Sequence, residues 1–235
     1  MKRRGDFIWA SVLIIISTFL ILPQTNKIYT YLNSIHPFIL AFLKFSILAT
    51  MGELLALRII SARWVKTKGV FTKAIVWGIV GITVVFMFML FPLGIVGLVN
   101  KGVLYGGTGF GRTLLIGIYT SIVLNFAFAP VFMSVHRISD TFIDMRVGGL
   151  KPKIGEVIEK IDWPAFIKFV MGKTIPFFWI PVHTITFILP ENYRVLFAAY
   201  LSIALGIILA YAKKKAVNSA RNSCRELDHY SKKGQ

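Results

Sequence analysis

The sequence predicts an all-α, polytopic membrane protein: a helical bundle of about six hydrophobic segments with both termini on the cytoplasmic side. Of its 235 residues, 56% are hydrophobic and only 16% are charged, which is too apolar for a soluble domain. A bilayer core requires about 20 mostly apolar residues per helix. Stretches that approach this length cover residues 7–23, 37–60, 75–99, 113–136, 165–188 and 193–212.

The first stretch follows a basic start, which makes a cleaved signal peptide an alternative to a membrane helix. No small residues stand at the spacing of a cleavage site before Gln24, and more apolar stretches follow. We therefore expect an extra N-terminal membrane helix and its connection over residues 1–30. A multi-pass core over 31–212 and a basic cytoplasmic tail over 213–235 would follow.

The fifth stretch is less regular than the others, because it contains Lys168, Lys173, Pro176 and Pro181. Charged residues and prolines at membrane depth are tolerated where the backbone is buried in protein or lines a wet cavity. Two readings stay open for residues 165–188. The segment either spans the membrane or forms a broken, re-entrant element.

An amphipathic helix is predicted just before it, over residues 153–161. Apolar residues recur there at helical spacing, with Lys153, Glu156, Glu159 and Lys160 between them. Trp163 then suits the headgroup layer. We interpret this segment as an interfacial helix, and docking of a partner protein is the alternative.

The net charge is +17, from 27 Lys+Arg against 10 Asp+Glu. In a soluble protein this excess would point to nucleic acid, but here the bases flank apolar segments. With six spans, 21 of the 27 bases share the side of the two termini and 4 lie opposite. The prediction is a lipid bilayer environment, with anionic lipid at the cytoplasmic face, no nucleic acid, and a homo-oligomer left open.

No pattern for catalysis or for a cofactor is found. The stretch "GGTGFGRT" at 106–113 imitates a phosphate-binding loop, but no strand precedes it. The four histidines lie far apart, and the single cysteine, Cys224, excludes an intrachain disulfide. We expect no enzyme activity, no catalytic residue, no cofactor and no metal site.

Polar residues within the apolar segments are the candidate functional groups, because such residues usually face a bundle interior or a wet cavity. Lys44 and Glu53 are nine residues apart and lie on nearly opposite faces of one helix, so they cannot neutralise each other. Glu53 then needs another partner: a base on another span, for which Lys173 is a candidate, a kink, or a second chain. The candidate polar pathway consists of Lys44, Glu53, Asn125, Lys173 and His183.

Four ordered motifs resemble the peroxisomal membrane protein 22 family. They are His36-Pro37 followed by Gly52-Glu53, "NFAFAP" at 125–130, "DWP" at 162–164, and "FFWIPVHTITFILPENYR" at 177–194. Leu57, Leu124 and Gly206 stand where the family has polar residues. The motif residues for which the resemblance implies a structural role are His36, Pro37, Gly52, Pro130, Asp162, Pro164, Trp179, Pro190 and Arg194.

The resemblance implies a multi-pass membrane protein of membrane homeostasis, for which a channel-like role is proposed and no enzyme activity is established. We therefore expect permeation of small solutes or ions, with a non-conducting scaffold or interaction protein as the alternative. Nothing in the sequence resembles an import signal, so the expected location is a prokaryotic cytoplasmic membrane. The mitochondrial inner membrane and the peroxisomal membrane are the alternatives.

Overall fold

The computed structural model describes residues 2–65, 67–204, 206–208 and 210, and that part of the chain contains helices and no strand. The predicted tail over 213–235, with Cys224, lies outside the described residues. The elements in chain order are α1 (Lys2–Ile21), α2 (Pro23–Ile35), α3 (Pro37–Ser61), α4 (Val70–Asn100), α5 (Gly109–Val123), η1 (Leu124–Phe128), α6 (Ala129–Val147), α7 (Ile154–Glu159), α8 (Trp163–Phe166), η2 (Ile167–Trp179) and α9 (Ile180–Ile188). A further helical segment covers Glu191–Ile208.

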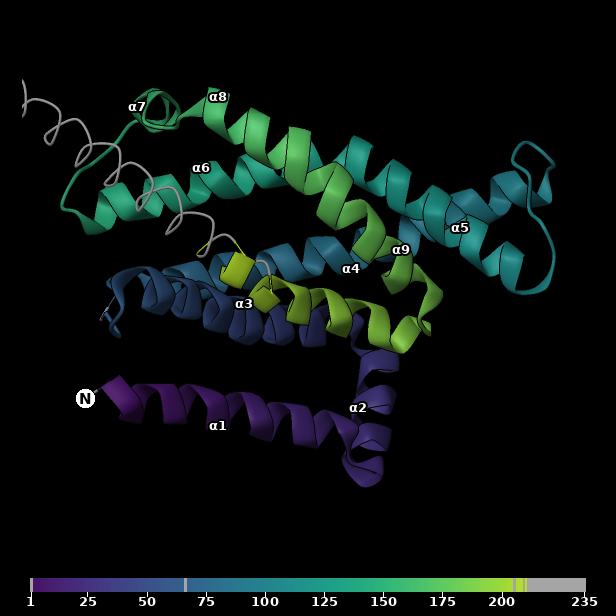
Figure 1. Cartoon of the computed structure of the whole chain (residues 1–235), viewed down its shortest axis with the longest axis horizontal. Coiled ribbons are helices and arrows are strands. Elements are labelled where there is room, and N and C mark those ends of the chain that lie inside the picture. The colour runs from purple at the N-terminus through teal and green to yellow at the C-terminus, as the bar shows by residue number, and fades with distance from the viewer. Residues whose placement is uncertain (1, 66, 205, 209, 211–235) are drawn as a thin grey trace, which may run out of the picture.

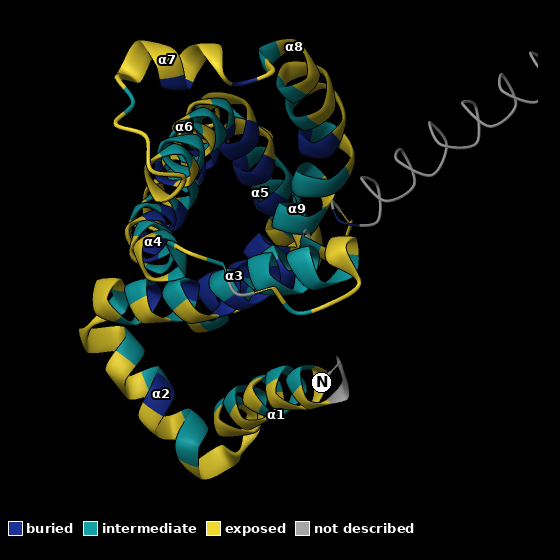
Figure 2. Cartoon of the chain, turned by 90° about the vertical axis from the view of Figure 1, so that its left-hand side faces the viewer, coloured by how far each residue is buried: buried dark blue, intermediate teal, exposed yellow. Residues whose placement is uncertain are grey.

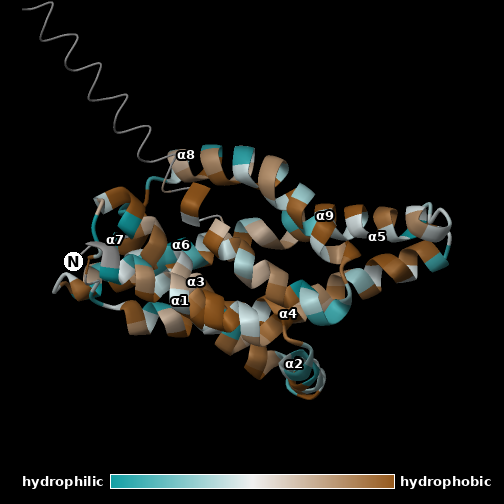
Figure 3. Ribbon diagram, turned by 60° about the horizontal axis from the view of Figure 1, so that its bottom comes forward, coloured by the Kyte–Doolittle hydropathy of each residue, from teal (hydrophilic) through white to brown (hydrophobic). Residues whose placement is uncertain are grey.

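Among the described residues, six helical segments are long and apolar enough to cross a membrane, which confirms the predicted all-α class and the number of segments. They are Arg4–Ile21, Pro37–Ser61, Val70–Asn100, Gly109–Val147, Trp163–Ile188 and Glu191–Ile208. Figure 3 shows hydrophobic residues over most of the long helices. The chain is an integral membrane protein.

The first helix is followed by a second one that the sequence did not predict. Figure 1 shows α2 lying across the ends of α1 and α3. Its polar composition, "PQTNKIYTYLNSI", carries no long apolar run, so the search for spans passed over it. Proline at its start and Pro37 at the start of α3 separate it from both neighbours.

Helix α1 has no buried residue from Arg4 to Ile21, and Figure 2 shows it in the colours of exposed and intermediate residues. Its apolar side chains, such as Phe7 and Ile15, point outward, as expected for a surface that faces lipid. At its N-terminal end, Asp6 accepts hydrogen bonds from Arg58 and Trp64, and two further hydrogen bonds attach the helix along its length. Trp9 Nε1 donates to the carbonyl of Met51 over 3.0 Å, and the hydroxyls of Ser17 and Tyr200 lie 2.9 Å apart.

The centre of the bundle is the antiparallel pair α3 and α4. At Gly81 an added Cβ would lie 2.5 Å from the carbonyl oxygen of Ala41, so only glycine permits this approach. Gly78 lies as close to Phe42. Gly94 and Gly97 further along α4 differ, since no other part of the described chain lies within 4 Å of a Cβ built at either one.

A second close approach joins α3 to the segment Glu191–Ile208. A Cβ at Gly52 would lie 2.8 Å from the carbonyl oxygen of Ser202, and a Cβ at Gly206 would lie 2.7 Å from that of Gly52. Two glycines therefore let the two backbones touch.

The fourth span is longer than predicted, since α5, η1 and α6 form one helical stretch of 39 residues from Gly109 to Val147. At 1.5 Å per residue this stretch is about 58 Å long, well beyond a hydrocarbon core of about 30 Å. Its C-terminal turns therefore extend past the predicted end at residue 136. The π-helical turns of η1 lie just before Pro130, whose missing backbone N–H interrupts the regular α-helical hydrogen bonding.

The segment 165–188 is helical throughout, as part of Trp163–Ile188. Most of it is the π-helix η2, which contains Pro176.

The helix that precedes this segment, α7, is shorter than the predicted 153–161. Val157 is buried there, whereas Ile154 is 62% exposed and Ile158 is 41% exposed. Asp162 accepts a hydrogen bond from the backbone N–H of Ala165 and so caps α8.

The helix ends divide into two groups. Figure 1 shows the N-terminus, the 62–69 connection and α7 at one end of the bundle, and α2 with the 101–108 connection at the other. We call the first the basic end, since it carries Arg4, Arg58, Arg63 and Lys68. Arg58 is paired there with Asp6, with 2.9 Å between Nε and Oδ1. That the basic end is cytoplasmic stays a prediction.

Candidate functional site

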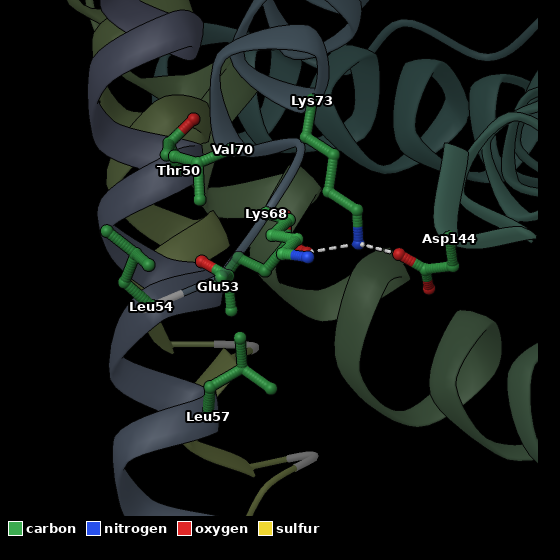
Figure 4. Close-up of a pocket in the computed structure, with 9 residues that line it drawn as sticks. Thr50, Glu53, Leu54, Leu57, Lys68, Val70, Lys73 and Asp144 are labelled. Atoms are coloured by element: carbon green, nitrogen blue, oxygen red, sulfur yellow. Dashed lines mark hydrogen bonds and ion pairs between the residues drawn. The ribbon is translucent and has the colours of Figure 1, made fainter. Parts of the chain in front are cut away.

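A lysine at the start of α4 joins three helices near the basic end. Gly69 precedes the helix with a φ of 81°, which turns the chain so that Lys73 lies in the first turn. Lys73 Nζ is 2.8 Å from Glu53 Oε1 on α3 and 3.0 Å from Asp144 Oδ1 on α6. Figure 4 shows the ammonium group between the two carboxylates. One cation thus ties α3 and α6 to α4.

A cavity of about 190 Å³ lies beside this bridge. Side chains of both charges line it together with Thr50 and Thr67, whose hydroxyl oxygens are buried and have no hydrogen-bond partner among the described residues. Groups of this kind bind water or a polar ligand where space is available. The lining residues are Thr50, Glu53, Leu54, Leu57, Thr67, Lys68, Val70, Lys73 and Asp144.

The bridge continues into the bundle through an aromatic pair. Trp77 Nε1 donates to Glu53 Oε2 over 3.4 Å, and the ring of Trp77 lies 4.2 Å from that of His136, centroid to centroid. His136 Nε2 is 3.6 Å from Asp140 Oδ2. We call this set, Glu53, Lys73, Trp77, His136, Asp140 and Asp144, the Lys73 cluster. Lysine, not a metal, lies between its carboxylates, and the described residues contain no grouping of His, Cys, Asp and Glu suited to a metal ion.

A second polar group lies further along the same bundle. Asn125, fully buried in η1, donates from Nδ2 to the carbonyl of Ser121 over 2.8 Å and approaches His183 Nδ1 to 3.0 Å. The ring of His183 stacks on Trp179 with 5.0 Å between centroids. Asn125 Oδ1 and Trp179 Nε1 have no partner among the described residues. We call Ser121, Asn125, Trp179 and His183 the Asn125 cluster.

The Lys73 cluster and the Asn125 cluster lie on the same face of α4, and they also lie on the same face of the Gly109–Val147 helix. Trp77 contacts His136, and Phe88 contacts His183 with 5.6 Å between centroids. Trp77 and Phe88 are eleven residues apart, as are Asn125 and His136. Eleven residues make about three helical turns and about 16 Å, so each helix presents both clusters on one face.

Between the clusters the bundle is apolar. Val80 and Val84 on α4 are each 8% exposed, and they belong to the buried core against which Phe128 and Phe132 pack. The Phe128 and Phe132 rings lie 5.2 Å apart. We call these four residues the apolar layer. It separates the Lys73 cluster, with its cavity, from the Asn125 cluster.

The predicted pathway residues do not form one continuous group. Asn125 and His183 are together, Glu53 lies in the Lys73 cluster, and Lys173 is exposed on the outside of η2. Lys173 was therefore the wrong partner for Glu53, since Lys73 forms that pair. The reason is the predicted start of the span at residue 75, which placed Lys73 in a loop, whereas α4 begins at Val70.

Lys44 lies at the opposite end from Glu53, as their spacing on one helix requires. Its Nζ donates to the Asn33 side chain over 2.9 Å and to the Tyr29 hydroxyl over 3.0 Å. The Tyr29 hydroxyl in turn donates to the carbonyl of Asn192 over 3.1 Å. Burial, with a smaller contribution from Tyr193, raises the pKa of Tyr29 above its ordinary value, so this hydroxyl stays protonated. Lys44 thus fastens α2 to α3.

The motif residues lie mainly at helix ends. His36 links α2 to α3, Pro37 begins α3, and Pro130 begins α6 after η1. Arg194 donates to the carbonyls of Leu189 and Phe187 over 2.9 and 3.1 Å, and so caps the end of α9. The others are Gly52 at the close approach, Asp162 and Pro164 at the start of α8, Trp179 at the end of η2, and Pro190 before the last segment.

Several residues of the Lys73 cluster escaped the sequence interpretation. His136, Asp140 and Asp144 follow one another at intervals of four residues, a spacing that places them on one helical face. That spacing is the signal that could have revealed them. A search restricted to the apolar stretch ending at residue 136 excludes the two aspartates.

Comparison with profiles of protein families, with characterised proteins and with solved structures found no match. The resemblance to the peroxisomal membrane protein 22 family therefore stays a prediction from the quoted motifs.

Proposed function

We propose that this membrane protein provides a path for small polar solutes or ions, and that the cavity beside Lys73 is the entrance to that path. The observation that carries the proposal is that the cavity is lined by Glu53 of α3, Lys73 of α4 and Asp144 of α6, where these three helices meet. Side chains of both charges line it, and these groups can replace part of the hydration of a polar solute.

The Asn125 cluster supports the same proposal from deeper in the bundle. Its unpartnered acceptor on Asn125 and donor on Trp179 are groups that a polar solute can satisfy. The apolar layer lies between this cluster and the cavity. Apolar constrictions close pores by excluding water, so the described conformation corresponds to a closed path.

Glu53→Gln tests the entrance. Purified protein in liposomes should give ion flux above that of protein-free liposomes, and this variant should lower the ratio of cation to anion flux by about fivefold, because it removes a charge at the mouth. Glu159→Gln is the matched control, since Glu159 is exposed on α7 near the same end and should leave the ratio unchanged. Absence of flux from well-oriented liposomes would contradict the proposal.

Val84→Asn tests the apolar layer. An amide there lets water enter the constriction, and we expect flux to rise about tenfold, a barrier change of about 1.4 kcal/mol. Val84→Ile keeps the layer apolar and should not raise flux. An unchanged flux in Val84→Asn, in protein that is still folded, would show that this layer does not close the path.

A non-conducting scaffold is the second candidate, and a specific observation favours it. Glu53 and Lys73 are already paired, and Val80 and Val84 of the apolar layer are buried. Polar groups would then serve to fix helix packing, and the exposed Ile154 and Ile158 of α7, beside basic residues, would contact lipid or a partner. In this case Glu53→Gln lowers stability and no variant changes flux.

For the location we propose a prokaryotic cytoplasmic membrane, with the basic end in the cytoplasm against anionic lipid. Mitochondrial inner and peroxisomal membranes are the alternatives, and assembly into a homo-oligomer is compatible with this proposal. A reporter inserted in the 101–108 connection tests the orientation, because it should be accessible only from outside. Accessibility from the cytoplasm would reverse it.

A further inference from the structure

His136 and Asp140 are the part of the Lys73 cluster in which charge is unbalanced. Lys73 forms ion pairs with Glu53 and Asp144, whereas Asp140 pairs, among the described residues, with His136 alone, at 3.6 Å. The Asp140 side chain is 23% exposed and that of His136 is 18% exposed. Asp140 Oδ1 and His136 Nδ1 are buried and have no hydrogen-bond partner in the part of the chain that the structure describes. Among the described residues Asp140 has no lysine or arginine within ion-pair distance, although Lys73 acts on it from further away, and such a carboxylate favours uptake of positive charge nearby.

The other charged groups around His136 come from three helices. On its own helix these are Asp140, Asp144 and the exposed Arg137, while Lys73 comes from α4 and Glu53 from α3. Lys68 also lines the adjacent cavity, but it is exposed. The carboxylates in contact with the cluster thus outnumber its one half-buried lysine.

We propose that the His136–Asp140 pair is a proton-binding site. The ligand is one proton from the water at the basic end, and it forms an N–H bond on the imidazole without breaking any bond in the protein. The resulting imidazolium is matched by the Asp140 carboxylate, and it lies against the Trp77 ring, whose centroid is 4.2 Å from that of His136 and whose π system attracts cations.

Proton binding at this pair weakens the ion pair between Lys73 and Glu53. Trp77 joins the two, because its ring contacts His136 while its Nε1 donates to Glu53. A positive charge on His136 competes with Lys73 for the negative charge of Glu53, which weakens the Lys73 bridge beside the cavity. The idea that a weaker Lys73–Glu53 bridge opens or closes the path rests on the proposed function, whereas proton binding at His136 does not.

Trp77 itself reports on the site, because a protonated imidazole in contact with an indole quenches its fluorescence more strongly than a neutral one, and the Trp77 and His136 ring centroids are 4.2 Å apart. The test uses the full chain with Trp9, Trp64, Trp163 and Trp179 replaced by phenylalanine, reconstituted in liposomes. We expect the emission of Trp77 to fall by about half in a single one-proton transition as the pH is lowered from 8.5 to 4.5. His136→Gln should abolish the transition. His183→Gln is the matched control and should leave it unchanged, since His183 contacts Trp179 in the Asn125 cluster.

Two charge changes then test the site with opposite signs. Asp140→Asn removes the carboxylate that favours the imidazolium, so the midpoint of the transition should move to lower pH by about one unit. Lys73→Gln removes a competing cation, so the midpoint should move to higher pH by about the same amount. Size-exclusion chromatography of each variant shows whether it is folded.

A Trp77 signal that is constant over this pH range, or a transition that survives in folded His136→Gln, overturns the proposal. Shifts of the same sign in Asp140→Asn and Lys73→Gln also overturn it. These measurements involve no transport. A normal titration in protein that gives no flux would therefore reject the proposed function and keep the proton site.

Discussion

Lys73→Met is expected to lower the free energy of unfolding by about 2 kcal/mol. Removal of one member of a deeply buried ion pair costs about 3–5 kcal/mol, because the other charge is left uncompensated. The side chain of Lys73 is 14% exposed and that of Glu53 is 26% exposed, so water reduces this cost. The measurement is unfolding by a denaturing detergent, titrated into protein in mild micelles.

Two further variants separate the bridge from a general effect of substitution. Asp144→Asn removes the partner that is 65% exposed, and it should cost no more than about 0.5 kcal/mol. Glu53→Leu combined with Lys73→Met removes both buried charges and should restore at least about half of the lost stability. If Lys73→Met unfolds at the same detergent concentration as the parent chain, the bridge does not hold the three helices together.

Gly52→Val is expected to have the largest effect on stability, about 3 kcal/mol. The Cβ alone would lie 2.8 Å from the carbonyl oxygen of Ser202, and a backbone atom cannot move aside as a flexible side chain can. The two helices must separate, which exposes the contacts between α3 and the Glu191–Ile208 segment.

Gly94→Val is the matched control for this prediction. Gly94 is also inside a long apolar helix, but nothing lies within 4 Å of a Cβ built there. The same chemical change should therefore alter the free energy of unfolding by less than about 1 kcal/mol. The detergent titration described for Lys73→Met compares the two, and similar losses in both variants would contradict the close approach at Gly52.

The spans could be predicted from the sequence because each is an apolar run of sufficient length, and all of them are helical where the structure describes them. Their ends could not, because hydrophobicity marks the part of a helix in lipid and not where the helix stops. Past residue 136, α6 continues through residues with good helical hydrogen bonding but mixed polarity, as far as Val147. Polar α2 was missed for the same reason.

This difference explains which site residues could be predicted. Glu53, Asn125 and His183 lie inside apolar runs, where any polar side chain is conspicuous. Lys73, Asp140 and Asp144 lie just outside those runs, where charged residues are common. Their role depends on which helix ends meet in space, and that follows from the packing of α3, α4 and α6.

The Lys73 and Asn125 clusters are separated by eleven residues both on α4 and on the Gly109–Val147 helix, and this shared spacing has a mechanical consequence. Trp77 and Phe88 lie on one face of α4, one touching His136 and the other His183. A rotation of α4 about its own axis turns both side chains through the same angle. A rigid α4 therefore cannot rotate to break the contact between Trp77 and His136 without also disturbing the contact between Phe88 and His183 at another depth of the membrane.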